Sequence, residues 1–364
     1  MSRLVKKSAS ELKKKEGTTA RTVFGSKVPL RIKVLLVVVL IAIMLISFAL
    51  GRFPVTPADL IMGIYNHFFN PDLVASSLDA GRVDRVIFEI RLPRILLVMF
   101  SGAGLAVAGA SLQGTFRNPL VSPDLLGASA GASLGVCAAI LLQFPIWAIF
   151  IAAFVGGLAA VGLALVLNRA VRYDPVLGLV LCGILVSMLF QAGMALVKFS
   201  ADTAGQLPAI TLLLMGSFSS VNSRDLLWSI IPLACGFILL FLQRWHLNVL
   251  SFGDEEARAM GVNTRRVRLI VIFASTLLTA VSVAVAGIIG WVGLVIPHLA
   301  RAIVGPNYKV LLPASAFIGA TYLLIIDDIA RLAMTIEIPI GILTAFIGVP
   351  VFLLIFRYSI KGWT

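Results

Sequence analysis

A charged segment at residues 247–268, LNVLSFGDEEARAMGVNTRRVR, interrupts an otherwise apolar chain. Ser251 and Asp254 have the S-x-x-D spacing of a capping box, the acids at 254–256 favour the positive end of a helix, and Gly261 can close that helix. Such a helix has roughly two turns and is too short to be stable alone in water. The charged side chains of this helix could form ion pairs with another protein. The segment is therefore either an interfacial loop between two membrane spans or a docking site for a cytoplasmic partner.

Cysteine and histidine, the residues that form disulfides or bind metals, are scattered along the chain. The cysteines Cys137, Cys182 and Cys235 and the histidines His67, His246 and His298 lie far apart in sequence. We expect the cysteines to be small packing residues, and we expect no catalytic residue, no metal site and no disulfide framework. The chain also lacks the G-x-x-x-x-G-K-[ST] motif, so it does not bind ATP through a P-loop.

The composition is that of an integral membrane protein. Of the 364 residues, 59% are hydrophobic and 13% charged, and the mean hydropathy is +1.02. We predict an all-α polytopic membrane protein with about ten transmembrane helices, each long enough to cross most or all of a hydrocarbon core of ~30 Å. The predicted spans are 34–50, 94–113, 124–142, 146–168, 176–198, 226–243, 268–287, 291–304, 310–327 and 339–356, and an extra short helix is expected near 206–217.

The net charge of +13 follows the membrane topology. If the N-terminus is cytoplasmic, most Lys and Arg residues fall on the inner side, as the positive-inside rule requires. Both termini are then predicted to be cytoplasmic, and the charge does not indicate nucleic-acid binding. Residues 1–33 are expected to form a basic, disordered cytoplasmic tail, and 34–364 the transmembrane domain.

The acidic residues argue against a proton-coupled carrier. Such a carrier usually needs a carboxylate near the middle of the membrane, where a charge is costly. The 17 acids fall in tails, loops and span ends, and Asp124, Asp327 and Asp328 come closest to lipid depth. An ion-coupled secondary transporter stays open as an alternative, because backbone carbonyls at a broken helix can hold sodium.

Several long motifs resemble one known family. They are RLPRILLVMFSGAGLAVAGASLQGTFRNPLVSPDLLGASAGASLG at 91–135, GDEEARAMGVNTRRVR at 253–268, AGIIGWVGLVIPHLAR at 286–301 and DDIARLAMTIEIPIGILTAFIGVPVF at 327–352. Their order and sequence resemble the FecCD-type permease subunits of ABC importers for iron-siderophore, haem and cobalamin. The resemblance runs from about residue 30 to the end of the chain.

This resemblance implies a set of partners. A second permease copy, identical or paralogous, would share the translocation path, and two ATPase subunits, which hold ATP and Mg²⁺, would bind on the cytoplasmic side. An extracytoplasmic solute-binding protein would deliver the ligand. The location implied is the inner (cytoplasmic) membrane of a prokaryote, and no cofactor is expected in this chain itself.

Particular residues match the functional motifs of the family. The segment at about 250–262 resembles its cytoplasmic coupling helix, with Gly253, Asp254, Glu255, Glu256, Arg258 and Gly261 at the motif positions. Arg91, Arg94 and Arg331 match arginines that pair with carboxylates of the binding protein, and anchoring or local pairing, such as Arg331 with Asp327, is the alternative.

The RNPL sequence resembles the inner gate region of the family, with Asn118, Pro119 and Leu120 at the matching positions. Pro119 would stop the helix and free carbonyls that Asn118 could satisfy, so a simple helix end is the alternative to a gate. The loop at 169–178 carries no family signature. The function implied is import of a metal chelate, with a ferric siderophore first and haem, cobalamin or molybdate as alternatives.

Overall fold

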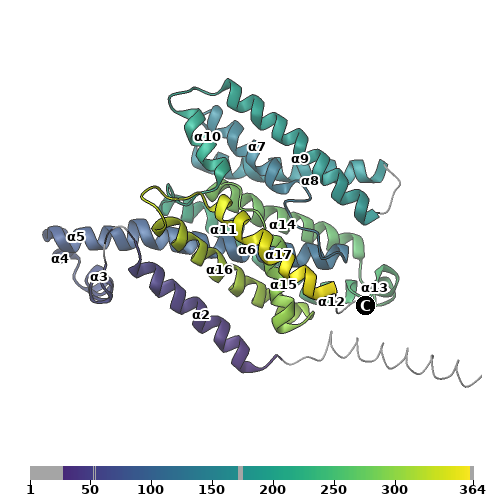
Figure 1. Cartoon of the computed structure of the whole chain (residues 1–364), viewed down its shortest axis with the longest axis horizontal. Coiled ribbons are helices and arrows are strands. Elements are labelled where there is room, and N and C mark those ends of the chain that lie inside the picture. The colour runs from purple at the N-terminus through teal and green to yellow at the C-terminus, as the bar shows by residue number, and fades with distance from the viewer. Residues whose placement is uncertain (1–27, 52, 54, 171–174, 361–364) are drawn as a thin grey trace, which may run out of the picture.

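The computed structural model describes residues 28–51, 53, 55–170 and 175–360, and these form helices joined by short loops (Figure 1). In chain order the helices are α2 (Leu30–Ala49), α3 (Pro57–Phe69), α4 (Pro71–Ser76), α5 (Leu78–Arg85), the π-helical η1 (Val86–Arg91), α6 (Leu92–Phe116), α7 (Ala128–Leu141), α8 (Ile146–Ala170), α9 (Pro175–Ser200), α10 (Gln206–Met215), α11 (Ser223–Leu242), α12 (Arg244–Leu250), α13 (Asp254–Ala259), α14 (Thr264–Ala286), α15 (Val292–Val304), α16 (Tyr308–Leu332) and α17 (Ile340–Ile360).

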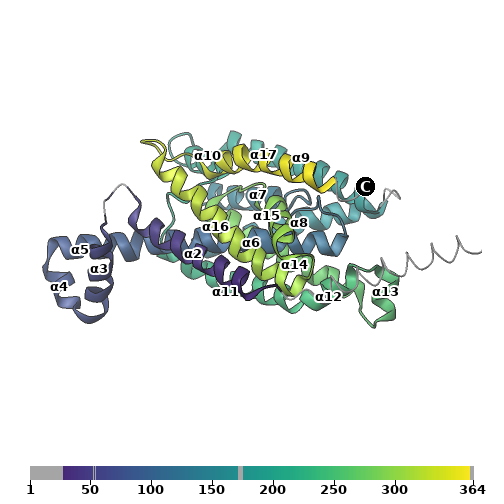
Figure 2. The ribbon, with the colours of Figure 1, turned by 60° about the horizontal axis from the view of Figure 1, so that its bottom comes forward.

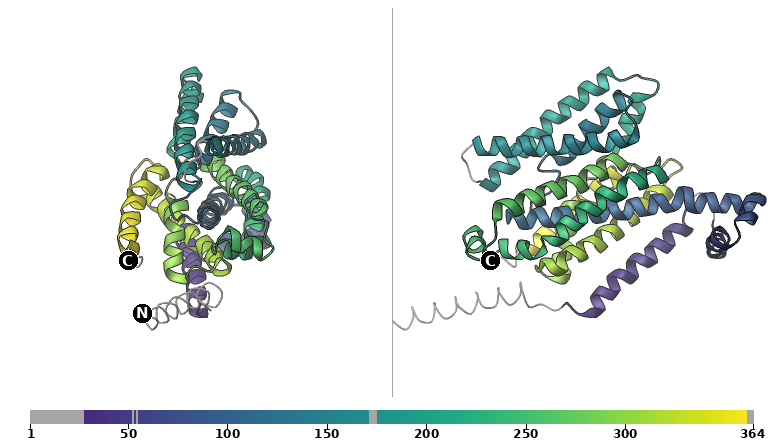
Figure 3. Two further views of the ribbon diagram at one scale, coloured as in Figure 1. Left: turned by 90° about the vertical axis from the view of Figure 1, so that its right-hand side faces the viewer. Right: turned by 180° about the vertical axis from the view of Figure 1, so that it is seen from behind.

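Helix α6 lies at the centre of the bundle and is surrounded by α11, α14, α15 and α16 (Figure 3). It is continuous with α5 and η1, and 83% of the most apolar window of this long helix is buried, against 11% for α2. A helix that is apolar on all sides and enclosed by other helices is a core helix rather than a lipid-facing one. Helices α7, α8, α9 and α10 form a second layer on one side of this core (Figure 1).

Glycine residues let the helices of the bundle approach closely, as their spacing in GASAGASLG predicts. A Cβ added at Gly131 or Gly135 would lie 2.2 or 2.1 Å from a carbonyl oxygen of α8. A Cβ at Gly109 of α6 would lie 1.8 Å from the carbonyl oxygen of Gly293 in α15. These positions tolerate only glycine because two backbones meet there.

The predicted spans correspond to helices of the structure (Figure 2). Among the described residues, seven helices are long and apolar enough to cross a membrane, and the prediction of an all-α polytopic membrane protein is confirmed. The predicted spans 124–142, 291–304 and 339–356 correspond to shorter apolar helices at 128–141, 292–304 and 340–354, and the extra helix near 206–217 corresponds to α10. The expectation that all cysteines are packed is wrong for Cys235, which is exposed, whereas Cys137 and Cys182 are buried.

The chain between the predicted spans 34–50 and 94–113 includes α3, α4 and α5, which project from the bundle (Figure 2). Thr56 and Asp59 form a complete capping box at the start of α3, and hydrogen bonds from Thr56 lower the pKa of Asp59. His67 of α3 contacts Asp84 of α5 at 2.7 Å and stacks on Phe88. The segment is therefore an ordered helical module.

This helical module and α13 lie at opposite ends of the long axis, with α6 between them (Figure 1). Helix α2 runs toward the helical module and α17 runs toward α13, an arrangement that agrees with the predicted common side of the two termini (Figure 1). Cytoplasmic termini stay a prediction. Most of the basic tail predicted at 1–33 and the centre of the 169–178 loop lie outside the described residues, and residues 30–33 belong to α2.

Candidate functional site

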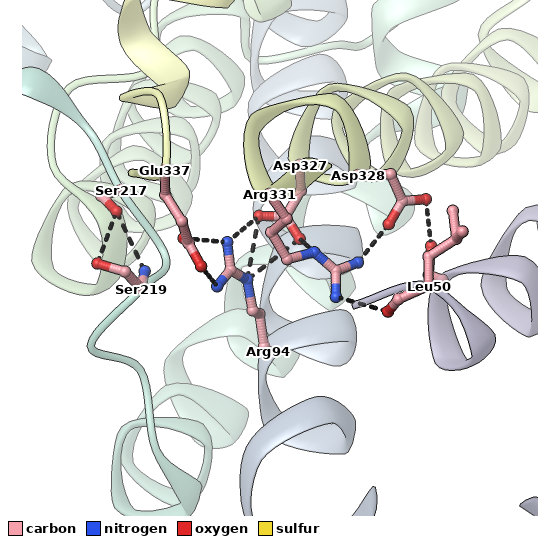
Figure 4. Close-up of polar contacts among 9 residues, drawn as sticks. Leu50, Arg94, Ser217, Ser219, Asp327, Asp328, Arg331 and Glu337 are labelled. Carbon is pink, nitrogen blue, oxygen red and sulfur yellow. Dashed lines mark hydrogen bonds and ion pairs between the residues drawn. The ribbon is translucent and has the colours of Figure 1, made fainter. Parts of the chain in front are cut away.

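A buried cluster of charged side chains joins α2, α6, α16 and the loop before α17 (Figure 4). Arg94 is at its centre. Its Nε and Nη2 donate to Asp327 at 2.8–3.2 Å, and Nη1 and Nη2 donate to Glu337 at 3.1 and 2.8 Å. The Asp327 side chain is 0% exposed, so both charges depend on each other for solvation.

Arg331 extends the same cluster along α16. Its Nε lies 3.1 Å from Oδ2 of Asp327, an ion pair without hydrogen-bond geometry, and Nη2 donates to Asp328. Asp328 accepts a second hydrogen bond, of 2.6 Å, from Ser47 in α2. The alternative of local pairing between Arg331 and Asp327 is therefore present in the structure.

Arg91, at the end of η1, is used differently. Its guanidinium donates to the backbone carbonyls of Phe48 and Phe53, so it satisfies a last-turn carbonyl of α2 that has no partner within the helix. A Cβ at Gly51 would lie 2.7 Å from Nη2 of Arg91, and thus the chain turns directly over this side chain.

The structure brings Arg91, Arg94 and Arg331 together, but as buried groups. Their residues are 4%, 8% and 7% exposed. A docking contact with a binding protein would require these arginines to exchange internal partners for external carboxylates. The docking role stays a prediction, and Glu337, Asp328 and Ser47 are members of the cluster that local spacing did not identify.

The residues predicted as a gate follow the end of α6. The helix ends at Phe116 rather than at Pro119, and Arg117 closes it in the left-handed conformation with φ 51° and ψ 33°. The Asn118 side chain accepts from the amide of Leu120 at 2.9 Å. The backbone amide of Asn118 donates to the carbonyl of Gln113 at 3.1 Å, so the expectation that Asn118 satisfies a carbonyl at the helix end is confirmed. Its side chain forms a turn that directs the chain away from α6.

The segment after this turn lines a cavity of about 330 Å³. Polar groups reach it from the α6–α7 segment and from α9, and the non-helical residues between α14 and α15 form another wall. Its polar lining consists of Ser122, Asp124, Ser129, Ser187 and Gln191. Ile288, Gly290 and Trp291 also border a second, apolar cavity of about 780 Å³ between α10 and α17.

Non-helical backbone between apolar helices is tolerated at membrane depth only inside protein or beside water, because its amides and carbonyls need hydrogen-bond partners. Here the amide of Ser217 donates to the carbonyl of Ala286 at 2.8 Å, and the amide of Ile340 to the carbonyl of Gly216 at 2.7 Å. The irregular segments thus satisfy one another. Trp291 has a left-handed backbone with φ 71°.

The short helix α13 is the predicted coupling helix, and its ends differ from the prediction in one respect. The capping box between Ser251 and Asp254 is wrong, because the Ser251 hydroxyl donates to the carbonyl of Asn248 and α13 begins after Gly253. The closure by Gly261 is confirmed. Gly261 has φ 80° and its amide donates to the carbonyl of Arg258, while the next amide donates to the carbonyl of Ala257.

Charged residues on one face of α13 are exposed and available to another protein. They are Glu255, Glu256 and Arg258, with the exposed Arg265 and Arg266 nearby. The opposite face is held by Ala257, which is 0% exposed, and by Val262, which is 5% exposed. A rigid helix with a packed inner face and a charged outer face suits docking.

Asp254 faces inward and ties α13 to the bundle. Its two carboxylate oxygens accept from Nη2 of Arg268 at 2.7 and 2.8 Å, and Nη2 of Arg117 lies 3.9 Å from Oδ1. Sequence spacing does not reveal either partner, because one lies fourteen positions along the chain and the other on α6.

The sequence of this chain is similar to those of known membrane transport proteins. Residues 38–358 match the model of the FecCD transport family. The chain is 44% identical over 280 residues to the permease MolB of a molybdate import system in Haemophilus influenzae, which covers 76% of this chain and 83% of MolB. It is 37% identical over 350 residues to the permease YfmE of an Fe(3+)-citrate import system in Bacillus subtilis, covering 94% of this chain and 99% of YfmE.

A solved structure agrees with these relatives. An inward-facing metal-chelate type ABC transporter superposes with a TM-score of 0.77 at 38% identity, covering 91% of this chain and 100% of that one. The family match spans most of the described helices, including α6, α13 and the buried cluster. The chain is a permease of the FecCD transport family.

Proposed function

We propose that this chain is the transmembrane permease subunit of an ATP-driven importer that moves a metal chelate, a ferric siderophore in the first place, into the cytoplasm. The exposed charged face of α13 is the observation that carries this proposal. An ATP-driven permease without a P-loop of its own needs a separate ATPase, and a short rigid helix at one end of the bundle provides a place for it to bind. A solute-binding protein would supply the chelate at the opposite end.

Iron chelate is placed first because the Fe(3+)-citrate permease matches nearly the whole chain and the similar solved transporter is of the metal-chelate type. Molybdate is the second candidate, because MolB has the higher identity of the two permeases. Haem and cobalamin are further alternatives. We further propose that two permease copies line the path in the inner membrane of a prokaryote, with α9, α10 and α17 beside the cavities.

An ion-coupled secondary transporter is the competing mechanism. Asp327 is paired with both Arg94 and Arg331 and is poorly suited to carry a proton. Asp124 is the acid to test instead, because it lines the polar cavity, where Ser129 donates to it.

The test reconstitutes the permease in liposomes with its ATPase and binding protein and follows uptake of ⁵⁵Fe-loaded siderophores. The proposal requires uptake that depends on ATP and on the ATPase chain and persists in Asp124→Asn. Uptake by the permease alone on an ion gradient, abolished by Asp124→Asn, would establish the carrier mechanism instead.

A further inference from the structure

The residue that ends α6, Arg117, has an unusual backbone for its type. Its φ of 51° and ψ of 33° lie in the left-handed region, where a residue with a Cβ pays about 1–2 kcal/mol relative to a favourable conformation. Glycine usually occupies this position at the end of a helix. A strained arginine at a helix end indicates that its side chain is needed there.

The Arg117 side chain reaches the beginning of α13. Its Nη2 lies 3.9 Å from Oδ1 of Asp254, and a Cβ placed on Gly253 would lie 3.6 Å from its Nη1. The guanidinium therefore rests against the first residues of the coupling helix. Arg268 of α14 holds the same carboxylate at 2.7 Å, so one aspartate joins α6, α13 and α14.

Arg117 is also the first residue of the segment that borders the polar cavity. The turn formed by Asn118 and Leu120 follows it directly, and Ser122, Asp124 and Leu125 then line the cavity of about 330 Å³. A displacement of α13 that moves Arg117 must therefore move or strain this segment, because the chain between them is short and hydrogen-bonded.

The ion pair itself contributes little to folding. The Arg117 and Asp254 side chains are 49% and 28% exposed, and exposed pairs contribute typically about 0–1 kcal/mol. Its loss should leave the fold intact and change how the two elements move together. This separates it from the buried Arg94 cluster, whose loss affects stability.

We propose that Arg117 is a positioning residue that couples movement of α13 to the segment 118–125, whose residues Ser122, Asp124 and Leu125 line the polar cavity. The proposal rests on the function proposed above, since the movement of α13 is driven by a bound ATPase. Coupling between two sites can be carried by a contiguous chain of contacting groups, and Asp254–Arg117–Asn118 forms such a chain.

The experiment uses the full complex of permease and ATPase in nanodiscs. Leu125→Cys reports on the cavity in a Cys235→Ser background, which removes the exposed native thiol. The rate of labelling by a hydrophilic maleimide is compared without nucleotide and with ATP and vanadate. We expect nucleotide to change the rate about fivefold or more with Arg117, and the change to be largely lost in Arg117→Gln.

Two further variants and a control show whether the nucleotide response depends on the charge of residue 117 or on its backbone strain. Arg117→Gly relieves the strain but removes the charge, and it should lose the nucleotide response while its thermal stability stays equal or rises. Arg117→Lys should keep most of the response. Arg244→Gln, which removes an exposed arginine at the start of α12, is the matched control and should behave as wild type.

A double-variant cycle tests the pair directly. If the connection runs through Asp254, Arg117→Gln combined with Asp254→Asn should have no larger effect than Asp254→Asn alone. A full nucleotide response in Arg117→Gln would overturn the proposal while leaving the transport function intact. An ATPase that does not bind, or a wild-type complex without any nucleotide response, would overturn the transport function and the coupling role together.

Discussion

Arg94 and Asp327 are 233 positions apart in the chain and form a bidentate ion pair in which the carboxylate is completely buried. The pair joins α6 to α16, and Glu337 and Arg331 complete the charge balance around it. Burying such a pair carries a desolvation penalty that offsets much of its attraction. Loss of one partner is destabilising because it leaves the other charge buried without compensation.

Removal of one partner is therefore expected to destabilise the protein strongly. Asp327→Asn leaves Arg94 and Arg331 without their shared carboxylate, and breaking a buried pair costs about 3–5 kcal/mol. Thermal unfolding of the purified permease in detergent should show a large loss. The double variant Arg94→Met and Asp327→Leu should lose less than either Asp327→Asn or Arg94→Met, and equal stability of Asp327→Asn and wild type would contradict this view of the cluster.

Docking of the binding protein should depend on Arg94 beyond its role in folding. Arg94→Lys keeps the charge and loses the planar fork, so we expect association weakened about tenfold, which is about 1.4 kcal/mol, at low salt. The control is Arg82→Lys in α5, whose side chain is 69% exposed. If folded Arg94→Lys and Arg82→Lys permeases bound the binding protein with equal affinity, docking by Arg94 would be refuted.

The charged face of α13 should be needed for the ATPase. Glu256→Ala with Arg258→Ala removes exposed groups without touching the buried Ala257 side of the helix, so folding should be unchanged and association with the ATPase about tenfold weaker. Asp79→Ala with Arg82→Ala removes a matched exposed pair at the other end of the molecule. Normal ATP-driven transport by the α13 variant would count against docking there.

Glycine at the end of α13 should matter for its conformation rather than for space. A Cβ at Gly261 meets nothing within 4 Å, but φ is 80°, so Gly261→Ala should strain the closing turn by about 1–2 kcal/mol and weaken ATPase binding. Gly162→Ala, inside α8, also meets nothing within 4 Å and should be neutral or stabilising by up to about 1 kcal/mol. Equal ATPase binding in the two variants would show that the turn is not required.

Close packing of α6 against α15 predicts the opposite kind of defect. Gly109→Ala places a methyl group on the backbone of Gly293, which cannot move aside as a side chain could. Overpacking a tight contact costs about 1–3 kcal/mol or more, so the yield and unfolding temperature of the permease should fall, with Gly162→Ala as the control. A wild-type unfolding temperature would mean that the helices can separate without cost.

The helices were predictable from sequence because their signal is local. Runs of apolar residues located the helices of the predicted spans, and glycine spacing predicted close helix packing at Gly131 and Gly135 without naming the partner helix. The family was recognisable from long motifs. Its candidate docking residues lie toward opposite ends of the molecule, with the arginines near one end and the charged residues of α13 at the other (Figure 1).

The contacts of those residues were less predictable, because they depend on elements distant in sequence. Asp254 binds Arg268 and Arg117 in place of the amide groups of its own helix. The partners of Arg94 come from α16 and the loop after it. The module α3–α5 gives no strong sequence signal because its helices are short and mixed in polarity, and tertiary contacts such as His67 with Phe88 stabilise it.

The central claim, import of a metal chelate, is tested most directly in the host cell. The gene for this chain is deleted, and uptake of iron from a panel of ferric siderophores is measured beside labelled molybdate, haem and cobalamin. We predict that uptake of at least one ferric siderophore is lost, and that the wild-type gene restores it whereas the Glu256→Ala and Arg258→Ala variant does not. Unchanged iron uptake with loss of molybdate uptake would contradict the proposed cargo, and unchanged uptake of every compound would contradict the import function itself.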